Sequence, residues 1–106
     1  MDVHVSHRHD CWDDAMELCV EEEISRLEGC LERFGLRPTA LHVTVTQSGH
    51  LRTECSIRLS IPGLVLPARV SSLAMDDAVC RCVDELVKQV EHHGRTRHVP
   101  VFDSVG

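Results

Sequence analysis

The side chains with the richest chemistry in this sequence are its cysteines and histidines, of which it has 6 and 8. Four of them lie close together near the start of the chain: His4, His7, His9 and Cys11. Cys80 and Cys82 form a C-x-C pair. Imidazole and thiolate are common zinc ligands, but neither group has the C-x₂-C or H-x₃₋₅-H spacing of structural zinc sites. On a helix, Cys80 and Cys82 would point about 200° apart. We therefore expect no metal ion and no cofactor.

The other cysteines favour a structural role. Cys19, Cys30 and Cys55 fall at apolar positions of the predicted elements, and the chain is long enough to form a core without disulfides. Free cysteine is among the most buried residue types, so we expect these three thiols to be buried. A metal- or redox-responsive domain that uses the histidine-rich start and Cys80 remains an alternative.

Residue patterns typical of catalysis are missing from the sequence. We find no nucleophile paired with a base, no glycine-rich phosphate loop and no pair of carboxylates placed for acid–base chemistry. We therefore expect a protein that is not an enzyme and that takes no small-molecule substrate.

The composition is that of one small soluble domain: 106 residues, 42% of them hydrophobic. The chain has 17 acidic and 11 basic residues and a formal net charge of −6. This total argues against a general nucleic-acid binder, although a local basic patch can still bind. No apolar run approaches the roughly 20 residues that span a membrane, and the start lacks the apolar region of a secretory signal. We expect a cytoplasmic protein without a membrane partner.

The first long helix is predicted over residues 14–34. Either Asp13 or Asp14 can cap its start, and Gly35 suits a left-handed cap at its end. Apolar residues recur at spacings of three and four and form one stripe: Met16, Val20, Ile24, Leu27, Leu31 and Phe34.

The second helix is predicted over residues 74–92, with Gly94 just beyond it. Its apolar stripe consists of Met75, Val79, Cys82, Val83, Leu86 and Val90, so Cys82 should be buried. Cations follow one side of this helix at spacings of seven, four and three residues: Arg81, Lys88, His92 and Arg95. We expect one domain over residues 1–98 and a mobile tail over residues 99–106.

Four stretches alternate between apolar and polar residues and predict strands near residues 3–6, 41–46, 55–61 and 66–71. Pro62-Gly63 predicts the turn of an antiparallel hairpin between the last two. The order β-α-β-β-β-α predicts a two-layer α+β fold, in which two helices pack on one face of a four-stranded sheet. The other face, which carries Thr, His, Arg and Ser, can remain in water.

This order of elements resembles the ribosome hibernation-promoting factor family, also called ribosome-associated inhibitor A or sigma-54 modulation protein. The resemblance covers about residues 1–98. It includes Ala15-Met16 and Arg26-Leu27-Glu28 of the first helix, the segment 63–70, and the second-helix segment 83–90. Because this chain ends soon after the second helix, it resembles the short type.

The resemblance implies a fold like that of double-stranded-RNA-binding domains and a function without catalysis. Family members bind rRNA of the small ribosomal subunit in the channel between the subunits, and there they block the tRNA and mRNA sites. On this basis, eight residues are the predicted RNA contacts: Arg81, Lys88, His92, Arg95, Arg97, Arg26, Arg33 and Arg8.

One departure from the family supports a second hypothesis. The family's first helix usually presents lysines, whereas this chain has Glu21-Glu22-Glu23 there. The chain could instead be a protein-interaction or regulatory module that kept the fold and lost ribosome binding. Histidine gains charge as the pH falls, so acidification would strengthen any binding to RNA.

Overall fold

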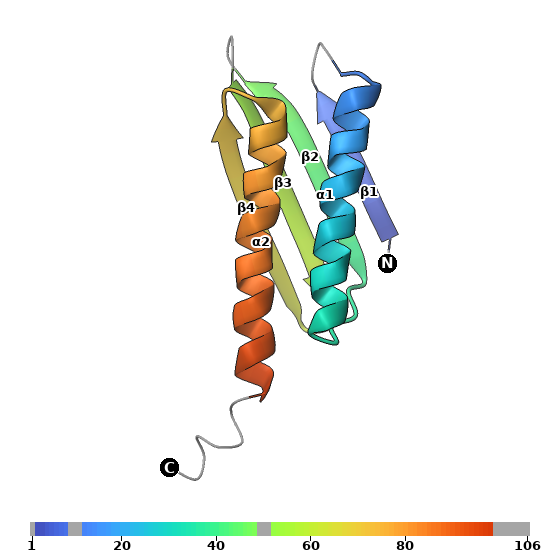
Figure 1. Ribbon diagram of the computed structural model, residues 1–106, viewed down its shortest axis with the longest axis vertical. Helices are drawn as coiled ribbons and strands as arrows, with labels where there is room; N and C mark the ends of the chain where they lie inside the picture. Colours follow the sequence, from blue (N-terminus) through green and yellow to red (C-terminus); the bar gives the residue numbers. More distant parts are fainter. Residues whose placement is uncertain (1, 9–11, 49–51, 99–106) are drawn as a thin grey trace.

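The computed structural model describes residues 2–8, 12–48 and 52–98, without the side chains of Ser48 and residues 95–98. The elements follow the predicted order (Figure 1): β1 (Asp2–Arg8), α1 (Asp14–Arg33), β2 (Ala40–Ser48), β3 (Arg52–Ile61), β4 (Leu64–Ser72) and α2 (Met75–His98). The predicted α+β fold is confirmed. The predicted mobile tail, residues 99–106, lies outside the described residues.

The four strands form one mixed sheet with the order β1-β2-β3-β4. The strand β1 is parallel to β2, and α1 makes the crossover that such a pair requires. The pairs β2–β3 and β3–β4 are antiparallel, which confirms the predicted hairpin. Gly63 in its turn has φ +80°, a left-handed conformation that favours glycine.

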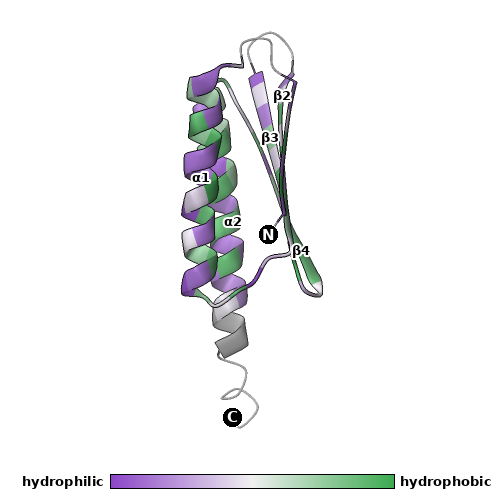
Figure 2. Cartoon of the chain, turned by 90° about the vertical axis from the view of Figure 1, so that its right-hand side faces the viewer, coloured by the Kyte–Doolittle hydropathy of each residue, from purple (hydrophilic) through white to green (hydrophobic). Residues whose placement is uncertain are grey.

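Both helices cover the same face of the sheet, and the core lies between the two layers (Figure 2). Alternate strand residues point into this core and are buried, for example Leu41, Val43 and Ile57. The predicted helix stripes face them, with Leu27 and Leu86 fully buried. Burial of this apolar surface is the main force that holds the helices on the sheet.

The termini of α1 show how local sequence sets the length of the helix. Asp13 is the N-cap, and its Oδ1 accepts a hydrogen bond of 2.9 Å from the Met16 amide. At the other end Gly35 has φ +67°, and its amide donates to the carbonyl of Glu32. The Leu36 amide donates to the carbonyl of Leu31, which completes a Schellman motif. Of the two possible N-caps, the structure therefore selects Asp13.

The predicted end of α2 at His92 is wrong, because the helix continues through Gly94 to His98. Gly94 is buried, and the ring of Phe34 packs against it. A Cβ placed at Gly94 would lie 2.5 Å from Cδ1 of Phe34, closer than van der Waals contact permits. Here glycine makes room for a neighbouring side chain instead of ending the helix.

Candidate nucleic-acid interface

The predicted cations of α2 lie on its outer face. Arg81, Lys88 and His92 are all exposed, so the spacing of these three residues does place them on one side of the helix. The backbone of Arg95 and Arg97 continues the same helix, but their side chains lie outside the description. The first three cations of the row therefore share one exposed side of α2.

Carboxylates accompany this row. Arg81 Nε lies 3.7 Å from Oδ2 of Asp77, and Lys88 Nζ lies 3.5 Å from Oε1 of Glu85. The side chains of Arg81 and Lys88 are 63% and 73% exposed, and exposed pairs of this kind contribute only about 0–1 kcal/mol. Because these pairs are weak, both cations can exchange their carboxylate for a phosphate.

Arg26, which is also a predicted RNA contact, makes contacts within the protein. Its Nη2 lies 2.7 Å from Oε1 of Glu23 and 2.8 Å from Oδ1 of Asp84, and it donates to the Cys80 carbonyl at 3.2 Å. Partial burial lowers the pKa of Arg26, but its hydrogen bonds to Glu23 and Asp84 outweigh that effect and raise it above the usual value. Arg26 thus connects α1 to α2.

The last two predicted cations lie at opposite ends of the molecule. Arg33 ends α1, where an exposed cation complements the helix dipole. Arg8 ends β1, near the start of α1 (Figure 1), and its register with Thr46 places it on the open face of the sheet. The structure therefore places Arg81, Lys88 and His92 along one side of α2, whereas Arg33 and Arg8 lie on other elements.

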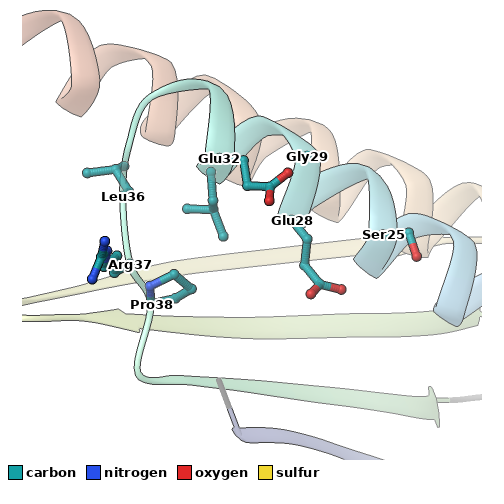
Figure 3. A pocket seen from close by; sticks show the side chains of 8 residues that line it. Ser25, Glu28, Gly29, Glu32, Leu36, Arg37 and Pro38 are labelled. Carbon is teal, nitrogen blue, oxygen red and sulfur yellow. The ribbon is translucent and has the colours of Figure 1, made fainter.

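The helix layer carries most of the negative charge. In sequence, α1 has seven acidic and two basic residues, and α2 has five acidic and four basic ones, so the layer totals −6. A hollow of about 500 Å³ beside the last turns of α1 shows the same bias (Figure 3). Glu28 and Glu32 line it from the helix, and Arg37 lines it from the following loop. This hollow has the wrong charge for a phosphate.

The cysteines in the described part of the chain are buried or half-buried. Cys30, Cys55 and Cys82 are buried as predicted, whereas Cys19 is half-buried. The Cys82 thiol donates to the Cys55 carbonyl at 3.4 Å, and contact with Cys82 together with burial raises the pKa of Cys55. Burial, with Glu23 and Asp84 nearby, also raises the pKa of the half-buried Cys80 thiol. A raised pKa keeps a thiol protonated and unreactive.

The metal hypothesis concerns the histidines and cysteines near the start of the chain and Cys80. Among residues 2–8, 12–48 and 52–98, no three His, Cys, Asp or Glu side chains are grouped so that they could hold a metal ion. His9 and Cys11 lie outside the described residues. His7 stacks on Trp12 with ring centroids 4.1 Å apart.

Neither helix in the described part of the chain has the length and apolar character needed to cross a membrane.

Comparisons with known proteins place this geometry in a family. The family described as sigma 54 modulation protein / S30EA ribosomal protein matches residues 3–98. A ribosomal subunit interface protein from Coxiella burnetii has a similar structure, with a TM-score of 0.74 and 16% identity over 88% of this chain and 97% of that chain. The N-terminal domain of Protein Y from Thermus thermophilus gives a TM-score of 0.70 and 21% identity over 88% of this chain and 99% of that domain. Curated proteins give no match.

These two structures share the fold, and the family match extends from β1 to the end of α2. The predicted resemblance is thereby confirmed. The chain belongs to the sigma 54 modulation protein / S30EA ribosomal protein family.

Proposed function

We propose that this protein is a cytoplasmic ribosome-associated translation inhibitor. It binds rRNA of the small subunit in the channel between the subunits and occludes the tRNA and mRNA sites. The observation that carries the proposal is the family match over residues 3–98, which includes every helix and strand of the domain. Steric occlusion needs a rigid body and phosphate contacts, but no catalytic group and no cofactor.

The contacts proposed on the helix side begin with Arg81, Lys88 and His92 and continue to Arg95 and Arg97. Arg33, Arg26 and Arg8 would add contacts from other parts of the surface. Lys88 is the most informative of these residues, because its side chain is 73% exposed and its pair with Glu85 is long. Phosphate contacts dominate affinity for RNA, and counterion release makes that affinity fall as salt rises.

Ribosome co-sedimentation tests the proposal. Purified protein is mixed with ribosomes and centrifuged through sucrose gradients at low and moderate salt. We expect the protein in the small-subunit and whole-ribosome fractions at low salt and less of it at moderate salt. Absence from the ribosomal fractions at both salt concentrations would overturn the proposal.

A charge reversal then tests the helix row. We expect Lys88→Glu to weaken sedimentation with ribosomes several-fold, since it removes one phosphate contact and adds a repulsive charge. Arg37→Glu is the matched control, because Arg37 is an exposed cation on the loop after α1 and is not a proposed contact. Equal losses from the two variants would show that net charge, and not the row, governs binding. Recovery of one stoichiometric protein partner without rRNA would favour the interaction-module hypothesis instead.

A further inference from the structure

The open face of the sheet has a different charge from the rest of the molecule. Strand residues that alternate with the core positions share this face, and the register aligns them across strands. Its described charged residues are four arginines and two acids: Arg8, Arg52, Arg58, Arg69, Asp2 and Glu54. The sheet thus carries +2, whereas the helix layer carries −6.

Among the described residues, most of this positive charge has no carboxylate partner within ion-pair distance. Of the four arginines, Arg69 is paired, with its Nε 3.3 Å from Oε1 of Glu54 and its side chain 73% exposed. Arg58 is exposed in the middle of β3. The register places it beside His42, whose ring stacks on that of His4 with centroids 4.8 Å apart. Arg58 and the two histidines form a row of nitrogen-rich side chains across three strands.

A shallow hollow of about 470 Å³ lies beside this row. Its lining combines one guanidinium and one imidazole with hydroxyl groups and a single apolar side chain: His42, Thr44, Ser56, Arg58, Ser60 and Val65. Arginine binds phosphate with two parallel hydrogen bonds, and hydroxyl groups are common ligands of phosphate and ribose oxygens. The chemistry of the hollow therefore matches one sugar–phosphate unit of a nucleic-acid strand.

A protein partner would require a different surface. The anchors of protein interfaces are enriched in Trp, Tyr and Arg and lie in well-packed, fully desolvated pockets, and the core of such an interface is mostly apolar. On the described open face, the apolar residues are Ala40, Val65 and Pro67, at one end or along one edge of the sheet. The centre of the face instead contains arginine, histidine and hydroxyl groups, which suit a phosphate backbone.

We propose that the open face of the sheet is a second RNA-binding surface, with Arg58 as its central phosphate ligand. This inference rests on the proposed function only in taking the bound RNA to be rRNA. A body that fills a channel has walls on both sides, so the sheet would contact one wall and the α2 row the other. The sheet face is formed by residues that the sequence-based prediction assigned to water, apart from Arg8.

Fluorescence anisotropy with a labelled single-stranded 12-nucleotide RNA, between 50 and 200 mM salt, tests this surface. We expect Arg58→Gln to lower the affinity roughly three- to tenfold at 50 mM salt. The slope of log K against log salt should shrink by about 0.7, the value for one phosphate contact in single-stranded RNA. Arg37→Gln removes the same charge from the loop after α1 and serves as the control, with the wild-type affinity expected.

Two results would overturn the inference. One is that wild-type protein does not bind the RNA at 50 mM salt, and the other is that Arg58→Gln and Arg37→Gln lower its affinity equally. Circular dichroism checks folding, and Arg52→Gln carries the same test if Arg58→Gln does not fold. Ribosome sedimentation of the wild type decides the proposed function separately: loss of RNA binding in Arg58→Gln without ribosome binding by the wild type would support this surface and refute that function.

Discussion

Gly94→Ala tests the packing between Phe34 and α2. Alanine usually stabilises a helix relative to glycine, but at this position we expect it to destabilise the protein. Glycine inside a helix is normally about 1 kcal/mol less favourable than alanine. At Gly94, however, the new Cβ would lie 2.5 Å from Cδ1, 2.8 Å from Cγ and 3.1 Å from Cβ of Phe34. Overpacking of this kind costs about 1–3 kcal/mol. Because the gain in helix propensity offsets part of this cost, we expect Gly94→Ala to lower the free energy of unfolding by about 1 kcal/mol.

Gly29 provides the matched control within the same fold. It is exposed in α1, and a Cβ built there would meet nothing within 4 Å. Gly29→Ala should therefore gain the full propensity term and raise the free energy of unfolding by about 1 kcal/mol. Urea denaturation followed by circular dichroism measures both variants. For a domain of this size, each change corresponds to roughly 4–8 °C in melting temperature, with opposite signs.

A second substitution identifies the cause of the effect. Phe34→Ala removes the Cγ and Cδ1 atoms that oppose the new Cβ, so it should cost less stability in the Gly94→Ala background than in the wild type. Contacting residues usually show coupling energies of about 0.5–3 kcal/mol in such a double-mutant cycle. If Gly94→Ala stabilised the protein as much as Gly29→Ala, the argument that the Phe34 ring requires glycine would be refuted.

Two further predictions concern the N-cap and the thiols. Asp13→Ala removes the acceptor of the Met16 amide and should lower the free energy of unfolding by about 1 kcal/mol in urea denaturation. Asp14→Ala should lower the free energy of unfolding by only about a few tenths of a kcal/mol. Equal effects of the two variants would contradict the assignment of Asp13 as the cap. Cys80 should react with iodoacetamide more slowly than free cysteine at pH 7.5, because burial, Glu23 and Asp84 raise its pKa and reduce its thiolate fraction. Its rate, followed by mass spectrometry of the labelled peptide, should still be rising at pH 9, and a plateau by pH 8 would contradict the raised pKa.

Local patterns predicted most of this fold. The alternation of Leu41, Val43 and Val45 identified β2 and its buried face, and the helical spacing of residues such as Leu27 and Leu86 identified the core stripes. These patterns are reliable where one face of an element is fully covered. Both Asp13 and Asp14 can cap a helix, so the sequence alone does not distinguish them. The backbone conformation of the structure identifies Asp13 as the N-cap.

The features that local patterns missed depend on contacts between distant segments. Where α2 continues past His92, Gly94 packs against Phe34. These two residues are far apart in the sequence, so no local rule includes their contact. On β1, Val3 and Val5 alternate as core residues do and share the helix-facing side with Leu41 and Val43, yet they remain 43% and 42% exposed because this edge strand is only partly covered. Alternation identified the face of these residues but not the extent of their burial.

The same limit applies to the candidate site. The spacing of Arg81 and Lys88 correctly placed them on one side of α2, but it gave no sign that Arg26 would bridge Glu23 and Asp84 between the helices. The alternation of the strands contained a signal for the sheet surface, since His42 and Arg58 occupy polar positions. Only the register between strands shows that these two residues are neighbours and that His4 stacks beside them.

The proposed RNA binding requires a chain with a net charge of −6 to bind a polyanion, and the distribution of its charge would allow this. At physiological ionic strength, charges are screened over about 8 Å. A helix with its side chains is about 10 Å thick, so the outer carboxylates of α1 and α2 lie more than one screening length from a strand of RNA on the open sheet face. Such a strand would interact chiefly with the sheet, which carries +2, and only weakly with the helix layer. The net charge therefore governs the overall repulsion between the protein and RNA, whereas the charge difference between the two faces orients the protein and favours binding through the sheet.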